Sequence, residues 1–510
     1  MTTIEHTSPP AGPPPTEPAA STVPPSRSVP ARGWVGPLLR RLHFYAGILV
    51  GPFIVVAATS GALYALSPQL ERVVYADELS APSVEAPQSL PPLSLEMQVA
   101  AAQEATGGEE TILAVRPAPE IGDTTRVLYA AEGLGASEAR TIFVDPGNGE
   151  IRGDLVTYGT SGALPLRTWI DDLHRNLHLG ETGRLYSELA ASWLGVVSLA
   201  GLGLWIARSR RQRAGKRAER AAAAGTETAG APGRASGYRR TRSLHATTGI
   251  WVLGGALFLS ATGITWSQHA GGNVGELRSA LSWSTPSVTA DLAGGSAPGE
   301  HTEHSGTEHA EHSGATAIEP AATAEPGLFD DVLEVARGEN VNVGLVEITP
   351  PAAAGEAWTV TEIQRSYPTE VDAVAVDGET LAVTDRVDFD DYPFAAKLAR
   401  WGIDMHQGTL FGLVNQLVLV AVAGAIALMV VWGYRMWWQR RPTRRPGRPV
   451  GKAPARGTFL RTPWWGQLAV LAVAAGVGLF LPLVGVSLVA FLVIDVLLGR
   501  REGRAAKVDR

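Results

Sequence analysis

The sequence of 510 residues contains no cysteine. This absence excludes disulfide bonds, thiolate nucleophiles, cysteine-ligated zinc, iron–sulfur clusters and covalently attached c-type haem. Any metal must therefore be bound through nitrogen or oxygen. Charged residues make up only 18% of the chain, and several long apolar runs contain none. Such runs indicate a polytopic α-helical membrane protein rather than a soluble one.

Uncharged runs of about 18 residues or more are long enough to cross a bilayer. There are five such runs, at residues 44–70, 189–207, 246–273, 407–434 and 462–494. The last run is too long for one helix, and the segment Leu481-Pro482-Leu483-Val484-Gly485 supplies a break near its middle. We therefore predict six membrane spans.

Charge predicts how these spans are oriented. Residues 208–242 and 435–461 hold 11 and 9 basic residues against 2 and 0 acidic ones, whereas residues 68–186 and 267–403 hold 8 and 6 basic residues against 18 and 23 acidic ones. Positively charged segments stay in the cytoplasm. We therefore expect a multi-pass plasma-membrane protein with both termini in the cytoplasm and two acidic extracytoplasmic parts.

The predicted organisation follows from the spans and their orientation. It comprises a disordered tail (1–35), a first span (36–70), a first outer domain (71–165), an outer helix with the second span (166–207), a basic loop (208–242), a third span (243–270), a linker (271–326), a second outer domain (327–398), a fourth span (399–436), a second basic loop (437–462), two C-terminal spans (463–482 and 483–499) and a tail (500–510).

The chain also contains an internal repeat. Leu42-His43-(three residues)-Gly47 matches Leu244-His245-(three residues)-Gly249 at an offset of 202, and Thr59-Ser60-Gly61 falls on Ala261-Thr262-Gly263. Trp169-(four residues)-His174 likewise matches Trp401-(four residues)-His406. Each outer part has a helix-like stretch (95–105 and 328–337) followed by strand-like runs (111–115 and 126–130; 341–348, 357–363 and 371–376). The repeat predicts a four-helix core built from both halves, with two small α+β outer domains.

The histidines are the candidate ligand residues. Imidazole is the usual neutral ligand of b-type haem, and a pair on facing helices can hold the iron from both sides. His43 and His245 share one depth and one sequence context, so they predict an inner haem site. His174 and His406 predict an outer one. The alternative for a single histidine at a helix end is a hydrogen bond at the lipid interface.

The identity of the outer ligands stays open in the sequence. His178-Leu-Gly180 imitates His406-Gln-Gly408, so His178 is a second ligand candidate or a neighbour of the haem propionates, with Arg175 and Arg184 as cationic partners. His269 could be either structural or a ligand. A His/Glu-rich segment could bind Zn(II), Cu(II) or iron, or could be a plain linker; its histidines are His301, His304, His309 and His312.

Other functions find little support. Lipid headgroups account for the basic loop 208–242, so we expect the bilayer as partner and no nucleic acid. Walker motifs and dinucleotide fingerprints are absent from any suitable strand-turn-helix setting, so we do not expect direct oxidation of NAD(P)H.

Together these motifs resemble the PepSY-associated transmembrane-helix family of iron-regulated membrane proteins. The resemblance covers roughly residues 36–440 and includes the histidine motifs, Gly263-Ile-Thr-Trp266-Ser and Val144-Asp145-Pro-Gly-Asn-Gly149-Glu. It implies a four-helix b-haem core with PepSY domains outside, and similar members act as ferric-siderophore reductases.

The sequence therefore predicts a di-haem b electron-transfer protein that reduces a ferric siderophore or another Fe(III) chelate outside the cell. Its electrons would come from a quinol or a cytoplasmic donor. Two alternatives remain. The protein could be a non-enzymatic scaffold whose PepSY domains bind an envelope partner or protease, or a cytochrome subunit that passes electrons to a separate reductase.

Overall fold

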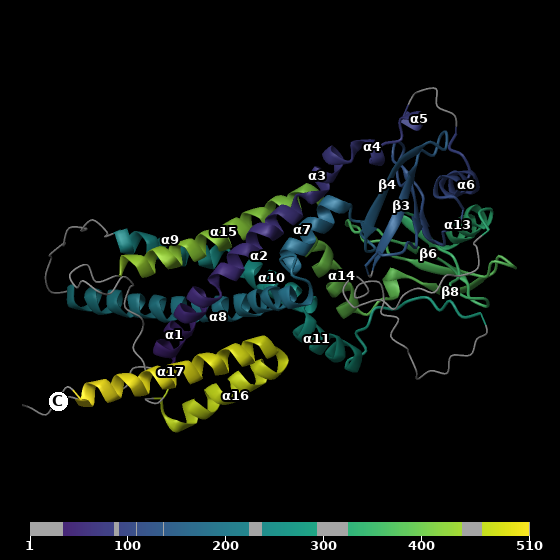
Figure 1. Ribbon diagram of the computed structural model, residues 1–510. Coiled ribbons are helices and arrows are strands. Elements are labelled where there is room, and N and C mark those ends of the chain that lie inside the picture. Colours follow the sequence, from purple (N-terminus) through teal and green to yellow (C-terminus); the bar gives the residue numbers. More distant parts are fainter. Residues whose placement is uncertain are drawn as a thin grey trace, which may run out of the picture.

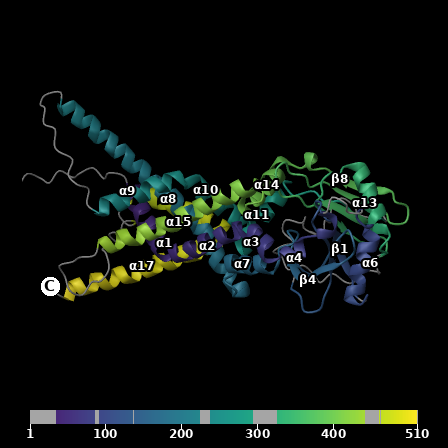
Figure 2. The same ribbon diagram turned by 90° about the horizontal axis from the view of Figure 1, so that it is seen from above.

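The computed structural model describes residues 34–85, 91–108, 110–135, 137–223, 237–292, 325–440, 459 and 462–508. A bundle of long helices forms one end of the molecule and a β-sheet domain forms the other (Figure 1). Short helices lie between them, and a view turned by 90° shows the same separation (Figure 2). The protein is thus a membrane-associated helical protein with one sheet domain.

The bundle contains up to four membrane spans by length and composition. Two single helices qualify: the part of α8 (Gly180–Ala223) up to Gly215, and α15 (Gly412–Gln439). Two further spans are each a pair of helices bent by 60°, namely α1 (Val35–Leu49) with α2 (Gly51–Ala65), and α9 (Gly237–Trp251) with α10 (Leu253–Thr265). Among the described residues, two of the six predicted spans are thus single helices of sufficient length, and the number rises to four if each bent pair is one span.

The two bends occupy equivalent places in the repeat. The first lies at Val50 and the second at Val252, again 202 residues apart. Pro52 follows the first bend and has no backbone N–H to donate, which weakens a helix at that point. Gly254 and Gly255 follow the second bend, and glycine has a low helix propensity. The repeat thus preserves the bend even though the residues beside it differ.

The C-terminal part forms a helical hairpin beside the bundle (Figure 1). Its helices are α16 (Trp464–Phe480) and α17 (Pro482–Val508), whose apolar parts are shorter than those of the four spans. The helices approach closely at two glycines, because a Cβ atom on Gly485 would lie 2.8 Å from Cα of Gly478. Trp193 Nε1 of α8 donates a hydrogen bond to Ser487 Oγ at 2.9 Å, which fixes the hairpin to the bundle.

The sheet domain is one antiparallel sheet of eight strands in the order β4-β3-β2-β1-β5-β6-β7-β8. The first half supplies β1 (Ile112–Arg116), β2 (Thr125–Tyr129), β3 (Glu138–Val144) and β4 (Ile151–Tyr158), and the second supplies β5 (Val346–Thr349), β6 (Trp358–Glu362), β7 (Ala373–Val376) and β8 (Val383–Val387). The halves meet where Val115 of β1 pairs with Ile348 of β5. The two outer units that the sequence predicts therefore share a single sheet.

One helix from each half covers the same region of the sheet. These helices are α6 (Leu95–Thr106) and α13 (Leu328–Glu339), and their apolar side chains, such as Val99 and Phe329, lie in one core with the central strands. Asp330 of α13 accepts hydrogen bonds from the backbone N–H groups of Leu95 (2.9 Å) and Glu96 (2.8 Å) at the start of α6. The second half thus caps a helix of the first.

Short helices connect the sheet to the bundle. They are α3 (Ser67–Val74), α4 (Ala76–Leu79), α5 (Pro82–Glu85), α7 (Pro165–Arg175), α11 (Gln268–Ala280), the 3₁₀ helix η1 (Phe389–Asp391) and α14 (Phe394–Gln407). The chain enters α7 directly after edge strand β4 and enters α14 after the opposite edge strand, β8. These two helices carry His174 and His406.

Candidate functional site

The bundle brings His43 and His245 together. His43 lies on α1 and His245 on α9, and their ring centroids are 6.0 Å apart with an interplanar angle of 78°. Two imidazoles on opposite sides of one metal ion, each bound at about 2.0–2.1 Å, have ring centres about 6 Å apart. The spacing of this inner pair therefore suits two ligands of a single metal ion.

A backbone carbonyl fixes the tautomer of each inner histidine. His43 Nδ1 lies 3.0 Å from the carbonyl oxygen of Val197 on α8, and His245 Nδ1 lies 3.0 Å from that of Met429 on α15. A carbonyl oxygen only accepts hydrogen bonds, so each Nδ1 must carry the hydrogen and donate. In a neutral imidazole the Nε2 atom then keeps its lone pair, which is the form that binds a metal.

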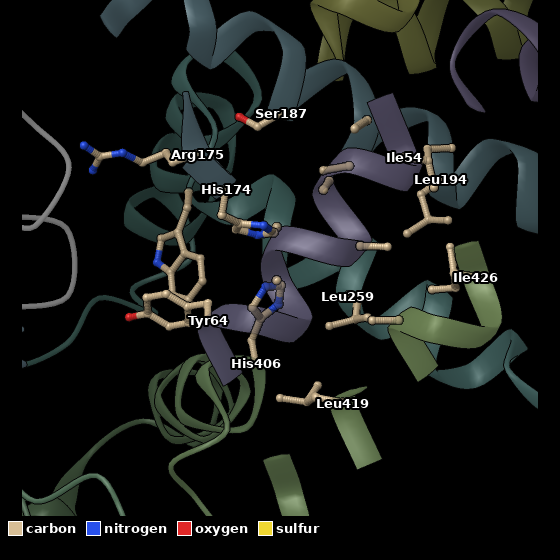
Figure 3. A pocket seen from close by; sticks show the side chains of 18 of the residues that line it. Ile54, Tyr64, His174, Arg175, Ser187, Leu194, Leu259, His406, Leu419 and Ile426 are labelled. Carbon is tan, nitrogen blue, oxygen red and sulfur yellow. The ribbon is translucent and has the colours of Figure 1, made fainter. Parts of the chain in front are cut away.

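His174 and His406 form an outer pair that lines one cavity from two sides (Figure 3). The cavity is partly open, and most of the side chains that line it are apolar. A mostly apolar cavity with a few convergent polar groups is typical of cofactor sites.

Hydroxyl groups fix the outer histidines. His174 Nδ1 lies 3.0 Å from Ser60 Oγ, and His406 Nδ1 lies 2.5 Å from Thr262 Oγ1. Each hydroxyl hydrogen is already donated to a helix carbonyl, from Ser60 to Val56 at 2.7 Å and from Thr262 to Phe258 at 2.9 Å. The hydroxyl oxygens therefore accept from Nδ1, and Nε2 of both outer histidines keeps its lone pair.

The outer cavity has an apolar side and a polar side. Ile54, Leu194 and Ile426 lie on one side, whereas Arg175 and Tyr64 lie on the other (Figure 3). A macrocycle with an anionic edge, such as haem, could place its body against the aliphatic side chains and its edge near Arg175, which is ion-paired with Asp171 and Asp172 on the same side of the cavity. The paired imidazoles and the apolar wall are the features that would hold haem b.

Glycines allow helices to approach two of the imidazoles. A Cβ atom added to Gly61 would lie 2.9 Å from His174 Cε1, and one added to Gly201 would lie 3.1 Å from His43 Cε1. By contrast, a Cβ on Gly47 would meet nothing within 4 Å. The close approach of helices to these two imidazoles thus depends on Gly61 and Gly201, whereas Gly47 contributes nothing to it.

The remaining predicted residues lie elsewhere. His178 is exposed and contacts the Trp169 ring, with centroids 4.9 Å apart, while His174 is the one that lines the cavity with His406. His269 is exposed at the start of α11, where its backbone N–H donates to Glu188. Arg184 lies 3.5 Å from Glu181. The His/Glu-rich segment with His301, His304, His309 and His312 is outside the described residues.

Sequence reasoning missed the groups that hold the four imidazoles. Ser60 and Thr262 occupy matching positions of the repeat, at the offset of 202, so the alignment contained a signal for them. Val197 and Met429 also match, at the offset of 232 that relates His174 to His406. They act through their backbone carbonyls, however, which no side-chain motif can indicate.

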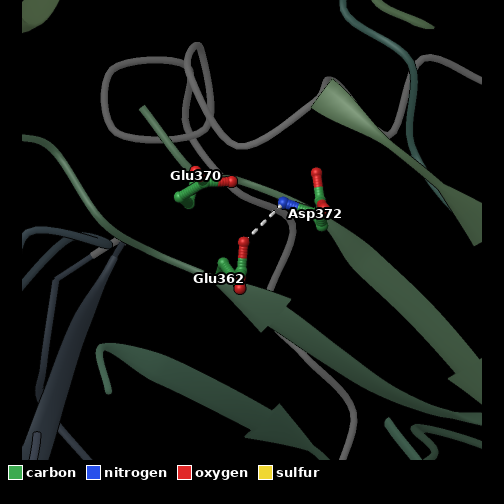
Figure 4. Close-up of side chains that lie close together, drawn as sticks. All are labelled: Glu362, Glu370 and Asp372. Atoms are coloured by element: carbon green, nitrogen blue, oxygen red, sulfur yellow. Dashed lines mark hydrogen bonds between the residues drawn. The ribbon is translucent and has the colours of Figure 1, made fainter. Parts of the chain in front are cut away.

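Three carboxylates gather at the end of β6 in the sheet domain, at Glu362, Glu370 and Asp372 (Figure 4). The buried Glu362 accepts hydrogen bonds from the backbone N–H groups of Asn342 (2.6 Å), Val343 (3.1 Å) and Asp372 (3.2 Å). Burial raises the pKa of Glu362 and that of Asp372. We assign Glu362 a structural role, because its oxygens bind the loops that precede β5 and β7.

Comparison with known proteins identifies the family. The sequence profile of the PepSY-associated TM region matches residues 40–440, which include both histidine pairs and the whole sheet domain. A comparison with curated proteins found no significant match. Since the profile covers most of the chain, the protein belongs to the PepSY-associated TM family.

Proposed function

We propose that the protein is a di-haem b electron-transfer protein that reduces a ferric siderophore or another Fe(III) chelate at the face of the membrane that carries the sheet domain. The observation that supports this most strongly is the tautomer of the four paired histidines. Nδ1 of each imidazole lies within hydrogen-bond distance of a carbonyl or hydroxyl oxygen, which favours the tautomer with the lone pair on Nε2. A structural histidine at a helix end has no need of such an arrangement in two matched pairs.

In this proposal His43 and His245 hold the inner haem, and His174 and His406 hold the outer one. Bound haem b would supply one-electron transfer, which neither the side chains nor the bilayer can provide. Arg175, on the polar side of the outer cavity, would bind the propionates. The aliphatic side chains opposite would form the apolar wall against the macrocycle.

The two sites are close enough along the helices to act together. Leu194 lines the outer cavity, and Val197, whose carbonyl holds His43, is three residues further along α8. In α15, Ile426 lines the cavity and Met429 holds His245. Three residues of helix rise about 4.5 Å. The outer cavity therefore ends about one turn from the groups that hold the inner pair.

The orientation in the membrane is also part of the proposal. Of the basic segments 208–242 and 435–461, the described helical parts 208–223, 237–242 and 435–440 lie at the end of the bundle away from the sheet (Figure 1), and the positive-inside rule assigns such segments to the cytoplasm. The sheet domain and the outer pair would then face the exterior, where the Fe(III) chelate is met. A quinol or a cytoplasmic reductant would supply electrons at the inner pair.

The decisive experiment is a pyridine haemochrome spectrum of the purified full-length protein. We expect a b-type spectrum with close to two haems per chain, and reduced protein that is reoxidised by a ferric chelate. A haem-free protein from haem-replete cells would refute the proposal and favour a scaffold. Haem that is reduced but not reoxidised by ferric chelates would support the cytochrome-subunit alternative instead.

A further inference from the structure

The two histidine pairs differ in the groups that accept their Nδ1 hydrogens. The inner pair donates to backbone carbonyls, at Val197 and Met429. The outer pair donates to side-chain hydroxyls, at Ser60 and Thr262, and the His174 imidazole also has the backbone carbonyl of Ala57 as a hydrogen-bond partner. The backbone acceptors are fixed by the fold, whereas the hydroxyls depend on the identity of two residues.

Each hydroxyl connects an imidazole to the backbone of a spanning helix. Ser60 Oγ accepts from His174 and donates to the carbonyl of Val56, four residues earlier. Donating its hydrogen polarises the hydroxyl and makes its oxygen a better acceptor. Thr262 repeats the arrangement with His406 and Phe258. Ser60 is buried and Thr262 is half-buried, so water has limited access to the two hydroxyls.

We propose that Ser60 and Thr262 are positioning residues of the outer site, which fix the tautomer and orientation of His174 and His406 and set the redox potential of the metal that they bind. An Nδ1–H group that donates to an acceptor makes Nε2 a stronger donor to the metal. A stronger donor favours the more highly charged ferric state. Loss of the hydroxyls should therefore raise the potential of the outer site and leave the inner site unchanged.

This inference rests on the proposed function, and the experiment separates the two. The variants Ser60→Ala and Thr262→Val remove the hydroxyls; the second keeps the shape of the side chain. Ser60→Thr and Thr262→Ser retain the hydroxyls. Thr59→Ala is the matched control, because Thr59 Oγ1 donates to the carbonyl of Val55 in the same way but is exposed. The readout is a spectroscopic redox titration of the purified full-length protein.

We expect the potential of one of the two haems to rise in Ser60→Ala and Thr262→Val. Loss of the hydrogen-bond partner that orients a ligating histidine typically weakens metal binding about 10-fold or more. If the ferric state loses tenfold relative to the ferrous state, the rise is about 59 mV for one electron. The potential of the other haem should equal its wild-type value in these variants. In Ser60→Thr, Thr262→Ser and Thr59→Ala, both potentials should equal those of the wild type.

Three outcomes decide between the possibilities. Potentials in Ser60→Ala and Thr262→Val that equal those of Thr59→Ala would overturn the inference while leaving the proposed function intact. Ser60→Ala and Thr262→Val could instead lose the outer haem. In that case, retention of the outer haem in Ser60→Thr and Thr262→Ser supports a role for the hydroxyls. Loss of the outer haem in those two variants as well overturns the inference. A wild-type protein without haem would overturn the proposed function itself.

Discussion

His43 and His245 lie with their ring centroids 6.0 Å apart, although 202 residues separate them in the chain. Each ring donates to the carbonyl of a different spanning helix, so four helices define the geometry of this pair. A site assembled in this way depends on both halves of the repeat. A substitution that destroys the inner site should therefore leave the outer site intact.

Replacing a single ligand in either pair should remove the haem of that pair and keep the other haem. We expect His43→Ala and His174→Ala each to lose about half of the pyridine haemochrome signal, because each leaves one complete histidine pair. His178→Ala and His269→Ala are the controls, since both of these histidines are exposed. Loss of haem in His178→Ala with full retention in His174→Ala would reverse the assignment of the outer ligand.

Adding a single methyl group at Gly61 should disturb the outer site. The new Cβ would lie 2.9 Å from His174 Cε1, which is closer than side-chain carbons approach, so the imidazole must move. We expect Gly61→Ala to lower the content of outer haem or to change its absorption spectrum. Gly47→Ala is the matched control, because its Cβ would meet nothing within 4 Å. Equal spectra for the two variants would contradict this reasoning.

Asp330 should stabilise the sheet domain by capping a helix of the other half. Asp330→Ala removes the acceptor for two N–H groups at the start of α6, and the loss of a cap typically costs about 1 kcal/mol. Asp331→Ala provides the control, because Asp331 is exposed in the same first turn of α13. Chemical unfolding followed by circular dichroism measures the difference, and equal free energies of unfolding would disprove the capping role.

The carboxyl of Glu362 should make the stability of the sheet domain depend on pH. Because burial raises its pKa, the folded state binds this proton more tightly than the unfolded state. The free energy of unfolding should then rise as the pH falls from above the raised pKa towards the ordinary value of 4.5. Melting temperatures across this window should change less with pH in Glu362→Gln. The exposed Glu379→Gln should behave as the wild type.

Much of the site was visible in the sequence because both copies of the repeat contain it. The spacing of His43 from Gly47 and of His245 from Gly249 singled out the inner pair, and the structure brings these two rings together. The family was predicted from the same motifs, and the match over residues 40–440 confirms it. Haem binding itself remains a prediction.

The union of the two outer units was not predictable from local patterns. Strands β1 and β5 lie far apart in the chain, and the composition of neither strand indicates its partner. Their pairing through Val115 and Ile348 depends on the free edges that face each other after each half has folded. Backbone acceptors such as the carbonyl of Val197 were also not predictable, because every residue has a backbone carbonyl and the sequence does not mark which one accepts.

The shared sheet has a mechanical consequence for the outer cavity. Its two edge strands lead through the short segments 159–164 and 388–393 into α7 and α14, the helices that carry His174 and His406. Both imidazoles are thus attached to opposite margins of one continuous hydrogen-bonded body. The width and twist of that body influence where α7 and α14 begin, so we expect a substitution in the centre of the sheet to shift His174 relative to His406 without touching the cavity.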